Sequence, residues 1–129
     1  MVVEGGAVAF PGVGYGTAVH IRSDEDLLHF PYGAVLVARH STPEYVIVMQ
    51  KARAIVTDTG SLTGHMASLA REFGVPTLLD AKVAFAGIPS GAEVTVDAYS
   101  GRVYLGKVEE LMKLQRTKES LMSSSTLPR

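Results

Sequence analysis

Residues 57–76, TDTGSLTGHMASLAREFGVP, constrain the fold of this chain more than any other segment. Their apolar side chains recur at the i, i+3, i+4 and i+7 spacing of an amphipathic helix: Met66, Leu69, Ala70 and Phe73. Gly74 occupies the position of a C-terminal helix cap, and Pro76 prevents the helix from continuing. The preceding RAIVT segment at 53–57 is typical of a short buried strand. A strand, a glycine-containing loop at 58–64 and a helix are therefore predicted in direct succession.

The remaining segments predict a mixture of strands and helices. Short apolar runs bounded by turn residues predict further strands at 34–38, 75–79, 93–96 and 102–105. Residues 1–20 alternate apolar stretches with glycines, and we interpret the glycines from Gly12 to Gly16 as turn residues of a β-rich region. A polar helix is predicted from Lys107 to about Met122.

Residues 45–52, YVIVMQKA, admit two interpretations. Their β-branched residues favour a strand, whereas a helix would gather four residues on one face: Tyr45, Val48, Met49 and Ala52. The preceding Ser41 to Glu44 segment offers capping hydroxyls, and a proline is tolerated in the first turn of a helix. We therefore predict a helix here, and an α/β or α+β domain with helices packed on one side of a sheet.

Composition limits the partners that the chain can recognise. Its 129 residues, 47% hydrophobic, suit one compact domain, and 12 basic against 13 acidic residues give a net charge of −1. This balance provides no overall attraction to nucleic acid or to an anionic membrane, and no apolar run is long enough to cross a bilayer. We expect a cytoplasmic protein with neither of these partners.

The sequence contains no motif for several common kinds of catalytic or binding site. The chain has no cysteine, which excludes disulfides, thiolate metal sites and a cysteine nucleophile. His20, His29 and His40 lie in separate segments without metal-ligand spacing, so we interpret them as structural or surface residues. A GxxxxGK[ST] phosphate loop and a GxSxG nucleophile elbow are both absent from the sequence, so nothing predicts ATP binding or acyl hydrolysis.

His65 stands at the entrance of the predicted 66–73 helix, beside the apolar face rather than on it. A helix N-terminus offers free amides and a partial positive charge to an anion, and Gly60 and Gly64 let the backbone approach it. A neutral imidazole is a competent nucleophile toward phosphorus. The arrangement suits a group that accepts phosphoryl, although a lone histidine near a helix start is more often a cap or an incidental surface residue. Thr63 is predicted to cap the helix.

The same segment resembles the signature of the swivelling phosphohistidine domain of phosphoenolpyruvate (PEP)-utilising enzymes, namely PEP synthase, pyruvate phosphate dikinase and enzyme I of the sugar phosphotransferase system. The matching positions are Thr57, Gly60, Thr63, His65, Ala67, Ala70, Arg71, Gly74 and Pro76. Similarity extends through PGVGYGTA at 11–18, GAVLVARHSTPEY at 33–45 and GAEVTVDAYSGRVYL at 91–105. Only the tail after Lys107 lies outside it, so residues 1–106 would form the swivelling domain and 107–129 a C-terminal helix with a disordered tail.

The resemblance implies a swivelling β/β/α fold in which His65 is transiently phosphorylated. His65 would shuttle phosphoryl between a nucleotide-binding domain and a PEP/pyruvate barrel domain of the parent enzyme. Mg and ATP or PEP would bind in those partner domains, this domain would bind no cofactor or metal, and alone it would be inert. The resemblance further implies phosphoryl-binding or supporting roles for the residues around the histidine: Gly60, Ser61, Thr63, Gly64 and Arg71.

Two residues depart from the family pattern. Ser61 replaces the second glycine, and Gly64 replaces the Ser, Cys or Thr that usually precedes the histidine. Losing that side chain removes at most one hydrogen bond, a contribution of about 0.5–1.5 kcal/mol. An alternative therefore stays open, in which the domain has lost its chemistry and serves as an interaction or linker module. Arg71 is likewise open between a phosphate or partner contact and an ordinary solvated or carboxylate-paired side chain.

Overall fold

A long strand, β3 (Val13–Ile21), is shared by two sheets and organises the fold. The computed structural model describes residues 2–41, 43–82 and 84–125. The first half of β3 pairs antiparallel with β7 (Glu93–Asp97), and its second half pairs parallel with β4 (Val35–Ala38). The strands follow the order β1-β8-β7-β3-β4-β5-β6-β2, so β3 joins an antiparallel sheet to a largely parallel one.

The other strands extend these two sheets. They are β1 (Val3–Glu4), β2 (Ala7–Phe10), β5 (Ala54–Thr57), β6 (Thr77–Leu79) and β8 (Arg102–Leu105). The helices are α1 (Asp24–Leu28), the 3-10 helix η1 (Pro43–Val48), α2 (His65–Phe73), α3 (Ala84–Gly87) and α4 (Glu109–Ser125). No helix in the described part of the chain is long and apolar enough to cross a membrane.

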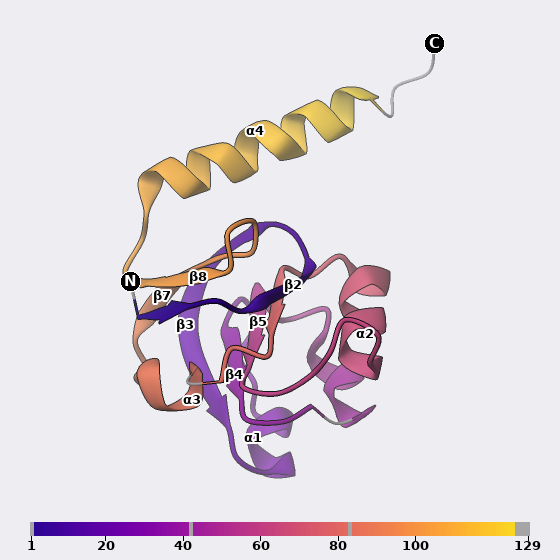
Figure 1. Ribbon diagram of the computed structural model, residues 1–129, viewed down its shortest axis with the longest axis vertical. Helices are drawn as coiled ribbons and strands as arrows, with labels where there is room; N and C mark the ends of the chain where they lie inside the picture. Colours follow the sequence, from indigo (N-terminus) through magenta and orange to yellow (C-terminus); the bar gives the residue numbers. More distant parts are fainter. Residues whose placement is uncertain (1, 42, 83, 126–129) are drawn as a thin grey trace.

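Three consecutive crossovers place α1, η1 and α2 on one face of the parallel sheet (Figure 1). Because β3, β4, β5 and β6 are sequential neighbours, right-handed connections bring every crossover to the same side. The opposite face packs against the antiparallel sheet and α3. The layers are helix, sheet and sheet, which confirms the predicted α/β class and the β/β/α arrangement.

The buried strands β4 and β5 supply both faces of this core. All four residues of each strand are buried, as expected for parallel strands covered on both sides. Leu36 and Ile55 pack toward the helices, whereas Val35, Val37 and Val56 pack toward the antiparallel sheet. Alternate residues therefore hold together two hydrophobic clusters, one on each side of the sheet.

Gly14 and Gly16 lie inside β3, so their assignment to turns is wrong. A Cβ at Gly14 would lie 2.4 Å from the carbonyl oxygen of Arg53, and one at Gly16 would lie 2.4 Å from that of Gly33. The glycines permit close backbone approach where β3 crosses neighbouring segments. Gly12, at φ +149°, is the residue of this group with a positive φ.

The helices differ from the predictions mainly in their lengths. The segment predicted as a helix over 45–52 is helical, but it forms η1 and ends at Val48. The C-terminal helix begins at Glu109 rather than Lys107 and extends to Ser125, while residues 126–129 of the predicted tail lie outside the described residues. Neither α1 nor α3 was predicted, and α3 packs on the face opposite α1, η1 and α2.

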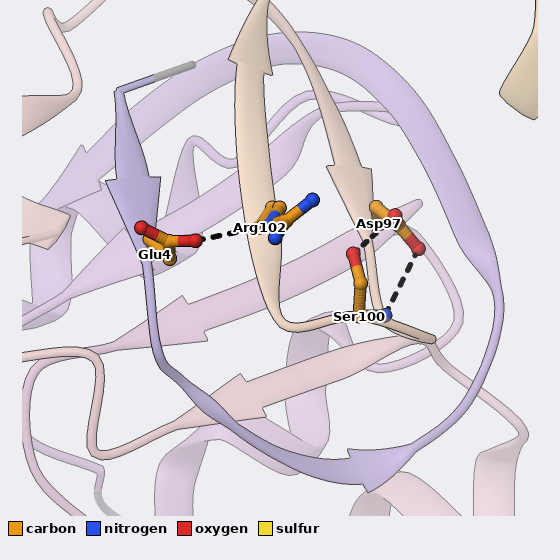
Figure 2. A network of polar contacts seen from close by, with 4 residues as sticks. All are labelled: Glu4, Asp97, Ser100 and Arg102. Carbon is orange, nitrogen blue, oxygen red and sulfur yellow. Dashed lines mark hydrogen bonds and ion pairs between the residues drawn. The ribbon is translucent and has the colours of Figure 1, made fainter.

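Polar contacts hold the β7–β8 hairpin and attach β1 to it (Figure 2). Asp97 Oδ1 accepts from the backbone amide of Tyr99 at 3.0 Å, and Asp97 Oδ2 accepts from the Ser100 hydroxyl. Arg102 Nε donates to Glu4 Oε2 at 3.2 Å across the β8–β1 pair. This hairpin is the connection expected through residues 97–101.

Candidate functional site

The candidate site lies where the parallel strands end. β3, β4, β5 and β6 run in the same direction, so the segments after their carboxyl ends emerge at one edge of the sheet. The loop after β5 leads directly into α2, whose first residue is His65. In open α/β sheets this edge is where ligands bind.

His65 lies at the entrance of α2, as predicted, where it is the first residue of the helix and is exposed. The preceding Gly64 is the N-cap, with an extended backbone at φ −85° and ψ 178°. Met66 and Leu69 are buried, so the apolar face of α2 packs inward while the imidazole stays accessible. The structure thus leaves the His65 ring free to meet a reactant from outside the domain.

Thr63 does not cap α2, which corrects the predicted capping role. The N-cap is Gly64, and it has no side-chain capping hydrogen bond. The Thr63 hydroxyl instead lies 3.2 Å from the Ser61 hydroxyl. The first hydrogen bond into the helix runs from Ser68 N to Gly64 O at 3.3 Å, so the amides of residues 65–67 precede the helical ladder. Such amides favour an anion.

The loop ahead of His65 is held by hydrogen bonds at its start. The Thr57 hydroxyl donates to Thr59 O at 2.6 Å, and the Thr59 amide and hydroxyl both donate to Arg39 O at 3.1 and 2.9 Å. Asp58 Oδ1 accepts from the Phe85 amide at 3.0 Å. The loop is therefore attached to the end of β4 on one side and to α3 on the other.

Gly60 has a backbone conformation that favours glycine. Its φ of +129° lies in a region that residues with a side chain rarely adopt. The space is not the constraint, because a Cβ there would meet Leu79 at an ordinary 3.5 Å. Gly74 at the other end of α2 is left-handed at φ 68°, which confirms the predicted C-terminal cap.

Arg71 reaches back along α2 to the same loop. Its Nη1 donates to Leu62 O at 3.4 Å and its Nη2 to the Ser68 hydroxyl at 3.5 Å, both long hydrogen bonds on the surface. Arg71 makes neither of the salt bridges found among the described residues. The structure therefore brings the Arg71 side chain next to the loop.

His40 is a neighbour of the loop that the sequence interpretation missed. Its Nδ1 lies 3.3 Å from the Thr59 hydroxyl oxygen, while its carbonyl accepts from the Tyr45 hydroxyl at 2.8 Å. His40 follows β4 and Thr59 follows β5, so the parallel pairing of these strands makes the contact. The one sequence signal for this contact was that His40 comes just after a predicted buried strand.

The described residues do not fit a resident metal ion. Over 2–41, 43–82 and 84–125, no three side chains among histidine, aspartate and glutamate come together. Mg²⁺ in phosphoryl-transfer sites is usually held by carboxylates and substrate phosphates.

Comparison with known proteins places this geometry in a family. The sequence profile described as "PEP-utilising enzyme, mobile domain" matches residues 30–101, which include the β5–α2 loop and His65. The probable PEP synthase of Staphylothermus marinus is 43% identical over 114 residues, covering 87% of this chain and 14% of that protein. The PEP synthase of Pyrococcus furiosus is 38% identical over 112 residues, again covering 87% of this chain and 14% of the relative.

Solved structures agree on the fold. The solution structure of enzyme I (nEIt) matches with a TM-score of 0.58 at 23% identity, covering 77% of this chain and 44% of that one. Aconitase X of Thermococcus kodakaraensis has a TM-score of 0.57 at 17% identity and covers 81% of this chain and 98% of that one. The fold alone thus accompanies different activities. The sequence matches are more specific, and they show that this chain belongs to the mobile-domain family of PEP-utilising enzymes.

Proposed function

We propose that this chain is the phosphoryl carrier of a PEP-synthase-like phosphotransferase, with His65 as the residue that holds phosphoryl. The observation that carries the proposal is an exposed histidine at the first position of α2, beside amides that precede the helical ladder. A phosphohistidine at this position would carry its negative charge next to those amides and the positive end of the helix dipole. Gly64, directly before His65, places no side chain next to the ring.

The transfer has two steps in this proposal. A ring nitrogen of His65 attacks the donor phosphorus with its lone pair, the nitrogen–phosphorus bond forms, and the bond to the donor's leaving oxygen breaks with its electrons. In the second step an acceptor oxygen attacks the same phosphorus, and the nitrogen–phosphorus bond breaks to restore the imidazole. The loop anchored by Thr57, Asp58 and Thr59 keeps the backbone amides in place throughout.

The donor and the acceptor are proposed to bind in other domains. The chain spans about 14% of the length of the PEP synthases that it matches, so most of such an enzyme lies outside this domain. A nucleotide-binding domain would supply ATP with Mg²⁺, and a PEP/pyruvate barrel would supply the second site. The carrier would alternate between them and, lacking either, would catalyse nothing alone.

A second candidate function is a linker or interaction module without chemistry. Ser61 and Gly64 favour it, because no hydroxyl or thiol stands directly before His65 and the N-cap has no side-chain hydrogen bond. The two candidates differ in what happens when His65 is removed. A carrier loses transfer, whereas a linker module retains whatever activity the assembled enzyme has.

The test compares two histidine variants in the assembled enzyme, with the donor and acceptor domains present. We expect His65→Ala to lower the overall phosphotransfer rate at least about a thousandfold, because the nucleophile is gone. His29→Ala is the matched control, since His29 is also exposed and lies at the end of α1, outside the loop and α2. An overall rate that His65→Ala leaves unchanged would contradict the carrier and favour the linker module.

A further inference from the structure

A cavity of about 440 Å³ opens beside the candidate site, at the carboxyl ends of β3 and β4. Its wall combines an apolar part, which includes Leu27 and Phe85, with a polar part that includes Arg22, Asp24, Arg39 and His40 and the Ser23 hydroxyl. Cavities of this size hold small molecules, with a few polar groups that fix orientation. His65 is not part of this wall, so the cavity is separate from the proposed phosphohistidine.

Two arginines of the cavity are held by one aromatic ring. The guanidinium carbon of Arg39 lies 4.4 Å from the centroid of the Phe85 ring, and that of Arg22 lies 5.7 Å from it. The buried His20 ring also packs against Phe85, with centroids 4.3 Å apart. Stacking on a ring orients a guanidinium while leaving its N–H groups available, which suits binding of an oxyanion.

The charges of the cavity favour an anion. Neither Arg22 nor Arg39 takes part in a salt bridge within the described residues. The lining contains two guanidinium groups against one carboxylate, that of Asp24. The neighbouring Asp26 accepts from the Arg22 backbone amide at 2.8 Å, so that carboxylate has a backbone partner. A net positive lining remains for a ligand.

We propose that this cavity binds a small phosphate-type oxyanion, with the guanidinium groups of Arg22 and Arg39 as its main contacts and Ser23 and His40 as further polar contacts. The apolar part of the wall provides room for a small organic group attached to the phosphate. The Tyr45 hydroxyl is already committed to His40 O, and it therefore fixes the His40 backbone instead of contacting the ligand. The site does not depend on the carrier role of His65.

The cavity is coupled to the loop that precedes His65. Phe85, which holds both arginines, donates its amide to Asp58 Oδ1, and His40 lies against the Thr59 hydroxyl. An anion bound to Arg39 and His40 would therefore contact two residues that are hydrogen-bonded to Thr59 of this loop. Occupancy should be detectable in the amides of residues 58 and 59, and more strongly at residues 22–23 and 39–40.

The experiment is a titration of the ¹⁵N-labelled 129-residue chain with inorganic phosphate, at constant ionic strength kept with sodium chloride. We expect saturable amide shifts at residues 22–23 and 39–40, and an apparent Kd that rises about tenfold or more in Arg39→Gln and in Arg22→Gln. Arg53→Gln removes an exposed arginine outside the cavity and should leave the Kd unchanged, as should His65→Ala. A parallel titration with a small phosphomonoester distinguishes free phosphate from an organic phosphate as the ligand. Tighter binding of the phosphomonoester than of phosphate would show that the apolar part of the wall contacts the organic group.

Two results would overturn the proposal. One is the absence of saturable shifts at residues 22–23 and 39–40 with either ligand in a folded wild-type chain. The other is shifts confined to residues 64–68, or a Kd that Arg39→Gln and Arg22→Gln change no more than Arg53→Gln does. The two proposals are tested by different variants. His65→Ala tests the carrier function and should leave anion binding in the cavity intact, whereas Arg22→Gln and Arg39→Gln test the anion site.

Discussion

Residue 64 is the N-cap of α2 and directly precedes His65, the proposed phosphoryl carrier. Its φ of −85° is open to any residue, and a Cβ there would lie 3.3 Å from Ser61 O, so a small side chain fits with a shift of a few tenths of an ångström. A serine at the N-cap supplies a hydroxyl that can bond an amide of the first turn or the phosphoryl oxygens. We predict that Gly64→Ser raises the rate of His65 phosphorylation in the assembled enzyme about two- to tenfold, the range of one hydrogen bond.

Rapid-quench labelling of the two proteins measures this difference directly. Ser68→Gly is the control, because it changes an exposed residue of α2 without adding a group before His65. It should not increase the rate of His65 phosphorylation. A Gly64→Ser rate equal to or below that of the unmodified chain would show that the glycine is the better residue at this position.

Gly14 is a residue whose lack of a side chain is required by packing. A Cβ would lie 2.4 Å from Arg53 O and 2.8 Å from Ala54 Cβ, and Ala54 is fully buried. We predict that Gly14→Ala lowers the free energy of unfolding by about 2 kcal/mol or more, because β3 must shift away from its neighbour. Urea denaturation measures the change, and Thr17→Ala, exposed on the same strand, should stay within about 0.5 kcal/mol.

Local chemistry explains which residues could be predicted. His65, Gly60 and Gly74 follow from positions within one strand–loop–helix unit, where spacing along the chain determines geometry. Arg39 and His40 could not be assigned to the site in the same way, because their approach to Thr59 depends on β4 pairing with β5.

The predicted cap by Thr63 failed for a different local reason. Its hydroxyl lies against Ser61, while the helix begins one residue later than a threonine cap would require.

Among the elements, η1 contains a buried tyrosine that is hydrogen-bonded to the segment before it. The Tyr45 hydroxyl donates to His40 O at 2.8 Å, and the side chain is buried in the helix-side core. Burial raises the pKa of Tyr45 from 10.0 to about 12. The folded state therefore keeps the proton at pH values where an unfolded tyrosine loses it, so this contribution to stability is complete below about pH 10 and is lost as pH rises through about 12.

We predict that Tyr45→Phe lowers the free energy of unfolding by about 1 kcal/mol at neutral pH, since one hydrogen bond is lost and His40 O is left without this donor. The difference between the variant and the original chain should shrink as pH rises from 10 toward 12. Denaturation at a series of pH values measures it, with Tyr32→Phe as the control because Tyr32 is 78% exposed. A difference that grows across this range would contradict the assigned cause.

The longer elements were predictable and the shortest were not. α2 has nine residues with a buried stripe, which gives helical periodicity enough positions to be recognised. α1 and α3 have five and four residues, fewer than two turns each, so neither repeats its pattern. η1 combines β-branched residues with a helical face, and the structure resolves the competition as a short 3-10 helix.

At the scale of the molecule, α4 is connected to the sheet by a hydrogen bond between residues far apart in the sequence. The Gln115 side-chain oxygen accepts from the Val13 amide at 2.9 Å, at the start of β3. We predict that Gln115→Ala lowers the free energy of unfolding by about 1 kcal/mol and speeds hydrogen exchange of the Val13 amide, which loses its acceptor. Lys113→Ala, exposed on the same helix, should change neither quantity. An unchanged Val13 exchange rate in Gln115→Ala would contradict the contact.

The separation of residues 107–129 from the 1–106 domain stays a prediction.

The topology of the whole molecule was beyond what periodicity can specify. The strand segments indicated a mixed domain, but the division of β3 between an antiparallel and a parallel sheet depends on contacts such as Val13 with Asp97 and Ile21 with Ala38. Such pairings join residues distant in sequence, and only the family resemblance supplied the β/β/α arrangement in advance. The same reasoning applies to the cavity between the ends of β3 and β4, which no single motif encodes.

The measurement that tests the central claim most directly is the chemical identity of phosphate bound to this domain. The assembled enzyme is supplied separately with labelled ATP or labelled PEP, quenched, and the protein-bound label is tested for lability in acid and stability in alkali, as expected of a phosphohistidine. The carrier account predicts such label on this domain and its loss in His65→Ala but not in His29→Ala. Absence of label with both donors, or label that persists in His65→Ala, would contradict it.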